Sequence, residues 1–104
     1  PVDVMVREGA FSDLSDPPPN ITSIKKGKTL GLGLSAALRE GDELSLLALT
    51  PSIQPISATS RVSGRYAQRF PRWSFPVGTR TGPLQIAIWL NDKLVDSRTI
   101  TVTD

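Results

Sequence analysis

Apolar residues recur at every second position along much of this chain. The pattern is clearest at 30–38, where leucines and alanine alternate with small residues, and again at 84–90. A period of two indicates β-strands that bury one face, because successive side chains of a strand point to opposite sides. The end of the first segment, 35–39, also fits the start of a helical turn, which the turn residues 40–42 would stop. The segments with strand character are 2–7, 21–24, 30–38, 44–50, 53–62, 84–90 and 94–102.

The last two segments predict a β-hairpin. Residues 84–90 alternate, 91–93 provide the turn, and 94–102 returns. In the returning strand, Asp96 and Arg98 share the parity of the apolar residues that follow them. Either a bulge reverses the facing of the strand, or the start of the strand extends beyond the core.

Prolines mark the exposed parts of the predicted fold. Residues 17–19 are three consecutive prolines, which lack amide donors and indicate an exposed connection. For the same reason, Pro55 indicates that the segment 53–62 is either a broken strand or a strand at a sheet edge. About seven short strands with frequent turns and no amphipathic helix predict an all-β domain, either a β-sandwich or a small barrel. We expect the sandwich.

About the last quarter of the chain resembles the final hairpin of bacterial immunoglobulin-like modules. Gly82 to Trp89 reads G-P-L-x-I-x-I-W, Asn91 to Val95 reads N-D-x-L-V, and Thr99 to Val102 alternates β-branched residues. The resemblance implies an immunoglobulin-like antiparallel β-sandwich of about seven strands. It implies no activity, because a fold of this kind carries many unrelated functions.

Length and residue inventory restrict the organisation and the chemistry. A chain of 104 residues predicts a single domain over 1–104. It contains neither cysteine nor histidine, which excludes disulfides, thiolate nucleophiles, Ser-His-Asp catalysis and imidazole or thiolate metal ligands. We therefore predict that the domain is not an enzyme and has no catalytic residues, no cofactor and no metal site.

No membrane anchor is predicted within the chain. Its apolar runs are far shorter than the roughly 20 residues that a membrane-spanning helix needs. The chain starts at Pro1 without a methionine, which fits a mature protein after signal removal as well as a trimmed chain. We expect an extracytoplasmic location, periplasmic or secreted.

Charge is distributed unevenly, although the formal net charge is only +2. Between Glu43 and Asp92 there is no acidic residue, whereas five arginines and most of the aromatic residues fall there. Arginines beside aromatic rings bind nucleic acid or acidic polysaccharide by ion pairing and stacking. A strand that points aromatics inward and arginines outward produces the same sequence without any ligand. The arginines are Arg61, Arg65, Arg69, Arg72 and Arg80.

Trp89 is the second candidate for a binding surface. It has the opposite parity to the leucine and isoleucines at 84–88, so it faces outward if those residues face the core. Exposed tryptophans favour partner surfaces. The alternatives for Trp89 are a strand that is buried on both faces or a loop that covers the side chain. Trp73 is predicted to lie in the core. The candidate ligand or partner surface comprises Arg65, Arg69, Arg72 and Trp89.

Carboxylates cluster in predicted turns, at 13–16, 40–43 and 92–96. Glycoside hydrolysis needs two carboxyl groups that face each other across a cleft, one of them with a raised pKa. Solvated turn carboxylates do not meet that requirement. An enzyme that relies on carboxylates, lysine or tyrosine alone is therefore the weakest of the functional interpretations, together with a purely structural domain of a larger protein.

Two binding hypotheses follow. The leading one is a noncatalytic binding or accessory module outside the cytoplasm that engages a protein partner or a cell-surface polymer through a strand edge or through loops. The alternative is binding of nucleic acid or acidic polysaccharide through the segment Arg61 to Arg80, with an affinity that falls steeply as salt rises.

Overall fold

The computed structural model describes residues 3–11, 20–35, 37–52, 54–62 and 71–104. These residues form eight β-strands and no helix, which confirms the all-β class. The expected count of about seven strands is too low, because the aromatic segment contributes a strand of its own, Arg72–Pro76. The strands are β1 (Asp3–Glu8), β2 (Ser23–Lys25), β3 (Thr29–Ser35), β4 (Glu43–Leu49), β5 (Ile56–Arg61), β6 (Arg72–Pro76), β7 (Gly82–Leu90) and β8 (Lys93–Thr103).

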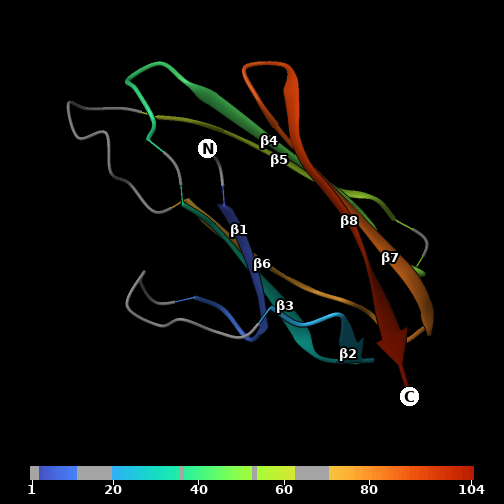
Figure 1. Cartoon of the computed structure of the whole chain (residues 1–104). Helices are drawn as coiled ribbons and strands as arrows, with labels where there is room; N and C mark the ends of the chain where they lie inside the picture. Colours follow the sequence, from blue (N-terminus) through green and yellow to red (C-terminus); the bar gives the residue numbers. More distant parts are fainter. Residues whose placement is uncertain (1–2, 12–19, 36, 53, 63–70) are drawn as a thin grey trace.

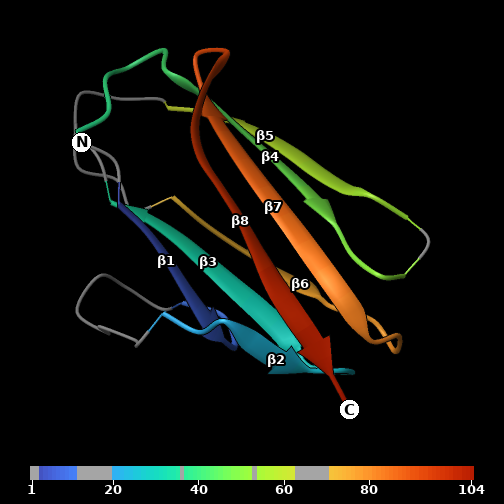
Figure 2. The same ribbon diagram turned by 45° about the vertical axis from the view of Figure 1, so that its right-hand side comes forward.

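The strands form two sheets that stack on each other (Figures 1 and 2). One sheet has three strands in the order β1-β3-β6, and the other has five in the order β2-β8-β7-β4-β5. The ladder between β2 and β8 is parallel and all the others are antiparallel, so the prediction of a purely antiparallel sandwich is wrong at β2. Strands must be antiparallel when a tight hairpin joins them. No hairpin joins β2 to β8, because β2 follows β1 of the other sheet in the sequence, so β2 is free to run parallel to β8.

The core lies between the two sheets and explains the period of two. Leu30, Leu32 and Leu34 of β3 are completely buried, and they belong to one cluster with the inward residues of the other sheet. Burial of such side chains is the main favourable contribution to folding, at roughly 25 cal/mol per Å² of apolar surface. The five-stranded sheet contributes Leu44, Leu46, Ala48, Leu84, Ile86, Ile88, Ile100 and Val102 to this cluster.

The strand predicted over 30–38 is shorter in the structure. It ends at Ser35, and the described residues 37–39 form neither a strand nor a helix. Leu38 is nevertheless completely buried in the core. The alternation therefore continues past the end of the ladder because a loop residue also packs inward. Trp73 is only partly buried and packs against the core cluster from β6.

The predicted hairpin is confirmed as β7 and β8, joined by a two-residue turn. Asn91 and Asp92 both have a positive φ, 50° and 65°, as expected for the tight turn that suits the twist of a hairpin. The register of the β7–β8 ladder shifts only between Ile88 and Trp89, close to the turn, and stays regular from Asp96 onward. Asp96 and Arg98 then lie on the same side as the buried end of the strand. They form an ion pair of 2.9 Å with side chains 21% and 28% exposed, so the start of β8 extends beyond the core.

The outer face of β3 is covered by the chain that follows β1. Gly31 lies on this face, and a Cβ atom at that position would collide with the carbonyl oxygen of Gly9. Phe11, two residues after Gly9, is only 5% exposed although it lies outside the core cluster. The guanidinium of Arg7 lies 5.5 Å from the centre of the Phe11 ring. The glycine at 31 therefore admits a second backbone segment, as strand glycines often do.

Candidate functional site

The two sheets have four edges, and an unpaired strand edge is a ready template for another chain. The outermost strands are β1 and β6 in the three-stranded sheet and β2 and β5 in the five-stranded sheet. Natural proteins protect such edges with short strands, prolines, lysines or covering loops. The four edges of this domain differ in this respect.

The edge of β1 is covered by hydrogen bonds from its own chain. The N–H of Val6 donates to Oδ1 of Asn20 at 2.9 Å. The carbonyl of Val6 accepts from the N–H of Ile21 at 3.2 Å. Both backbone groups at the centre of β1 are therefore satisfied on the side away from β3.

Two other edges carry ordinary protection. β2 is only three residues long, ends at Lys25 and is followed by Lys26 and Lys28. β6 ends at Pro76, which has no N–H to offer a neighbouring strand. Pairing of a foreign strand along either edge is hindered.

The edge of β5 has none of these devices within Ile56–Arg61, and Pro55, directly before the strand, limits the edge at that end only. Val62, directly after β5, donates to the carbonyl of Asp42 and accepts from the N–H of Gly41, both at 2.8 Å. In an antiparallel ladder, residues that bond to the neighbouring strand alternate with residues that point their backbone groups away. Every second residue counted back from Val62 therefore bonds to β4. The outward backbone groups belong to Ser57, Thr59 and Arg61, and we call them the β5 edge.

No strand in the described part of the chain pairs with the β5 edge. All three of its residues are exposed. The prediction that the segment 53–62 lies at a sheet edge is therefore confirmed. Figure 2 shows β5 at one side of the five-stranded sheet, with β4, β7 and β8 following it.

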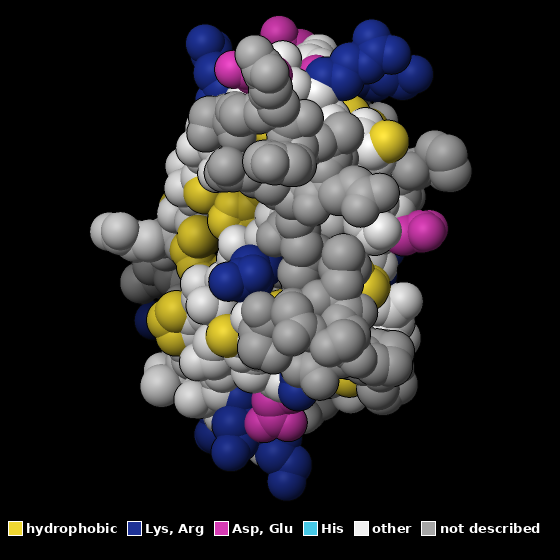
Figure 3. Space-filling model, turned by 90° about the vertical axis from the view of Figure 1, so that its left-hand side faces the viewer, with side chains coloured by type: hydrophobic (Ala, Val, Ile, Leu, Met, Phe, Trp, Pro, Cys, Tyr) yellow, Lys and Arg dark blue, Asp and Glu magenta, His cyan; other side chains and the backbone are white. Residues whose placement is uncertain are grey.

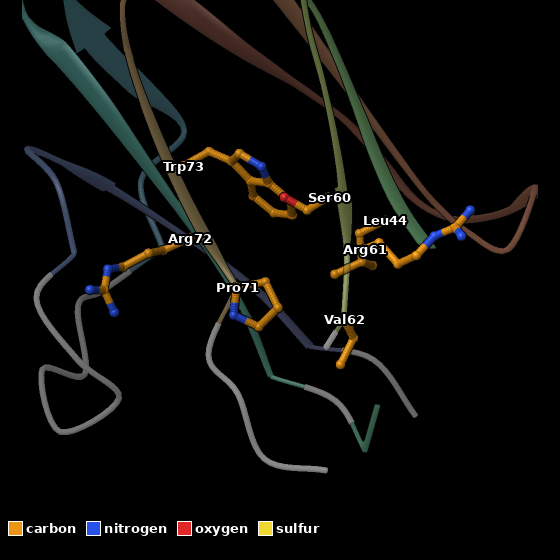
Figure 4. A pocket seen from close by; sticks show the side chains of 7 residues that line it. All are labelled: Leu44, Ser60, Arg61, Val62, Pro71, Arg72 and Trp73. Carbon is orange, nitrogen blue, oxygen red and sulfur yellow. The ribbon is translucent and has the colours of Figure 1, made fainter. Parts of the chain in front are cut away.

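A pocket of about 380 Å³ opens beside the β5 edge, between β5 of one sheet and β6 of the other. We call it the β5–β6 pocket. Figure 4 shows the Trp73 indole and the Ser60 side chain pointing toward each other across it. Its lining combines polar and apolar groups and includes the completely buried Leu44. The lining residues are Leu44, Ser60, Arg61, Val62, Pro71, Arg72 and Trp73.

Two arginines flank the β5–β6 pocket without pointing into it. In Figure 4 the guanidinium groups of Arg61 and Arg72 extend away from the pocket in opposite directions. Arg61 pairs with Glu43 of β4 at 3.2 Å and is 72% exposed, so this ion pair contributes little to stability. Arg72 has no carboxylate partner among the residues that the structure describes. Figure 3 shows that, on the side of the molecule it views, hydrophobic side chains reach the surface close to basic ones.

The four residues of the sequence-predicted surface do not form one described site. Arg65 and Arg69 lie outside the described residues. Arg72 lies on the outer side of the three-stranded sheet, because its neighbour Trp73 faces the core. Trp89 lies on the outer side of the five-stranded sheet, because its neighbour Ile88 is completely buried. Arg72 and Trp89 are therefore on opposite faces of the sandwich, and the role of each in binding stays a prediction.

Trp89 is half-buried on the outer face of the five-stranded sheet, so it is neither fully exposed nor fully buried. Its cross-strand neighbours are Ser45 of β4 and Leu94 of β8, and Leu94 is 53% exposed. Further along the same face, a shallow groove of about 280 Å³ lies over Ala87. Leu49, which is 41% exposed, borders that groove.

A hydrogen-bonded network joins the β7–β8 turn to the loop before β4. The carboxylate of Asp42 accepts from the N–H of Arg39 at 2.7 Å and from Nδ2 of Asn91 at 2.9 Å. These two bonds, with a smaller contribution from the Arg39 charge, hold the pKa of Asp42 below its usual value. Asn91 also accepts from the N–H of Glu43 at 2.9 Å. Asp42 is thus a structural turn carboxylate that lies next to the end of β5.

Comparison with known proteins gives no family. Neither a protein-family model nor a curated protein matches this chain. Within the described residues, no helix is able to span a bilayer, and no three side chains of metal-ligating type gather at one point. The β5 edge and the β5–β6 pocket are therefore the features of this chain that point to a function.

Proposed function

We propose that this chain is a noncatalytic binding module that captures an extended segment of a partner protein at the β5 edge. The observation that carries the proposal is the contrast among the four outermost strands, of which β5 alone is longer than three residues and, within its own bounds, without proline, lysine or a covering bond in the described structure. β8 is also open before Thr101, where its pairing with β2 begins, but that stretch starts at Lys93 and carries the Asp96–Arg98 ion pair. Strand addition to such an edge is a general mode of peptide recognition, in which main-chain hydrogen bonds supply affinity.

The immunoglobulin-like fold is part of this proposal. The first, third and sixth strands share one sheet, while the final hairpin is followed by β4 and then β5 in the other. This order supports an immunoglobulin-like topology in which β5 takes the place of the strand that extends the hairpin sheet. Modules of this kind act by presenting edges and loops, and we place this one outside the cytoplasm.

The proposal is tested with a phage-displayed library of random twelve-residue peptides selected against the purified domain. Peptides that pair with β5 slow hydrogen exchange at the amides of Thr59 and Arg61 and leave the amides of β1 unchanged. Thr59→Pro is the decisive variant, because its N–H points away from β4 and the substitution removes only the outward donor. We expect binding to fall at least a hundredfold in Thr59→Pro.

The matched control is Ser74→Pro on β6, whose N–H also points away from its sheet by the same alternation, starting from the bond between the Leu34 N–H and the Pro71 carbonyl. This variant is expected to bind the selected peptides as the wild type does. Peptides that bind Thr59→Pro as tightly as the wild type, or a selection that enriches no peptide, would contradict strand addition at β5.

A further inference from the structure

We propose that the β5–β6 pocket sets the sequence preference of the captured segment: a large apolar residue opposite Ser60, within a segment of acidic net charge. The inference rests on strand addition at β5, and it assigns the pocket as the site that receives one partner side chain. Three observations carry it, namely the direction of side chains on an added strand, the lining of the pocket and the charge around it.

The direction of the side chains follows from the register at β5. Thr59 and Arg61 present outward backbone groups, so a paired strand bonds to these two residues and places a non-bonded residue opposite Ser60. Residues directly opposite each other in a ladder point to the same face. Because Ser60 lines the β5–β6 pocket, the partner residue opposite Ser60 also points into the space between the sheets.

The apolar part of the pocket lining favours an apolar side chain. Leu44 is completely buried and Val62 is 6% exposed, and the Trp73 ring packs against the core and forms the wall on the β6 side. The volume of about 380 Å³ lies within the range of roughly 300 to 1,000 Å³ of ligand pockets, so it accommodates a leucine or an aromatic side chain. No charged group points into this space in Figure 4, and an apolar occupant leaves no buried charge unpaired.

The charge around the pocket favours an acidic partner. The chain carries no acidic residue from 44 to 91, whereas five arginines lie in that stretch. Among described residues, Arg72 at the pocket has no ion-pair partner, and Arg61 is matched only by Glu43. An unpaired positive charge such as Arg72 raises the association rate of oppositely charged segments and disfavours basic ones. An extended acidic segment with one large apolar residue therefore fits the edge, the pocket and the charge together.

The test uses the peptides enriched by the twelve-residue library and measures their affinity for five forms of the domain: the wild type, Thr59→Pro and three further variants. Ser60→Phe fills the pocket from an exposed position and should weaken peptides with a large apolar residue at least tenfold, while peptides with glycine or alanine at that position bind as before. Ser57→Phe places the same side chain on the opposite face of β5 and is the matched control. Arg72→Glu should weaken acidic peptides about tenfold and improve peptides in which the acidic residues are exchanged for lysine.

The outcomes separate the pocket from the edge. If Thr59→Pro abolishes binding while Ser60→Phe and Ser57→Phe behave alike, the pocket inference is overturned and strand addition stands. If Thr59→Pro binds normally, strand addition itself is wrong. A domain that dimerises without peptide and becomes monomeric in Thr59→Pro would assign the edge to a second copy of the chain and overturn the peptide inference.

A nucleic acid is the remaining alternative occupant, and a twenty-nucleotide oligo-dT is the probe for it. We expect that oligo-dT either does not bind or binds Ser60→Phe with the same affinity as the wild type. Tight, salt-dependent binding of this probe that is lost in Arg72→Glu and retained in Thr59→Pro would assign the basic segment to anionic polymers and overturn the inference.

Discussion

The edges of β1 and β5 pose the same physical problem and receive opposite treatment. Val6, at the centre of β1, has both outward backbone groups bonded, one to the side chain of Asn20 and one to the backbone of Ile21. Thr59, at the centre of the outward-pointing groups of β5, has no strand beside it in the described structure. A buried or half-buried polar group without a partner costs free energy, so the cover on β1 stabilises the domain, whereas the open β5 edge depends on water or on a partner.

The two sides also differ in how tightly the chain packs. Next to β1, the segment after Glu8 crosses the outer face of the three-stranded sheet so closely that only a glycine fits at 31. Next to β5, the space between the sheets is open as the β5–β6 pocket. Within the described residues, the domain therefore closes one side with its own chain and leaves the other side open, as the proposed binding function requires.

The largest expected effect comes from testing which backbone groups of β5 point outward. Ala58→Pro should lower the free energy of unfolding by about 3 kcal/mol, because it removes a hydrogen bond to β4, leaves a carbonyl of β4 unsatisfied and places a ring between the strands. Thr59→Pro, one residue away, should cost less than about 1 kcal/mol, because its N–H has no strand partner to lose. Urea denaturation measures both; equal losses would show that the alternation along β5 is assigned wrongly.

The next effect tests the covered side. Gly31→Ala should lower the free energy of unfolding by about 2 kcal/mol, because the added methyl group collides with the carbonyl of Gly9 and the covering segment must move. Ser74→Ala is the control, since Ser74 lies beside Gly31 on β6 and is exposed on the same face. Thermal unfolding of the two variants checks the difference, and an unchanged melting temperature in Gly31→Ala would mean that the segment does not press on β3.

The local parts of this architecture are predictable from the sequence, and the edges only in part. The rhythm at 30–34 and 84–90 predicts strands because each residue needs only its own neighbours to define which face is apolar. Pro55 likewise places β5 at an edge. The cover on β1 depends on Asn20, fourteen positions from Val6, and no periodic signal marks that contact.

The pocket and the candidate arginines show the same limit. Ser60 and Trp73 come together only because β5 and β6 end up at the same side of two different sheets. Residue type alone groups Trp89 with Arg72 in the sequence, yet the sheets place them on opposite faces. Alternation along each strand indicates that Trp73 and Ser60 both face inward. Only the order of the strands in the two sheets shows that these two side chains meet.

Removal of the cover on β1 should have a smaller effect on stability and a visible one on association. Asn20→Ala should lower the free energy of unfolding by about 1 kcal/mol, because the N–H of Val6 loses its partner. The uncovered edge should also raise self-association in sedimentation velocity at high protein concentration. Gln54→Ala, an exposed amide for which the described structure shows no hydrogen bond, is the control and should remain like the wild type. If self-association rises equally in Asn20→Ala and Gln54→Ala, the uncovered β1 edge is not its cause.

The smallest effect is a pH dependence at Asp42, whose backbone carbonyl accepts from Val62 at the end of β5. The bonds from Arg39 and Asn91 favour the ionised carboxylate, so the pKa of Asp42 lies below its value in the unfolded chain. The resulting stabilisation is complete above the unfolded pKa of about 3.9 and is lost as the pH falls through the folded pKa. The stability advantage of the wild type over Asp42→Asn should therefore be constant from pH 7 to about pH 5 and shrink below pH 4. Hydrogen exchange at the Val62 amide, followed over the same range, reports whether the end of β5 loosens with it; an advantage that persists unchanged into acid would show that the charge of Asp42 does not hold this corner of the domain.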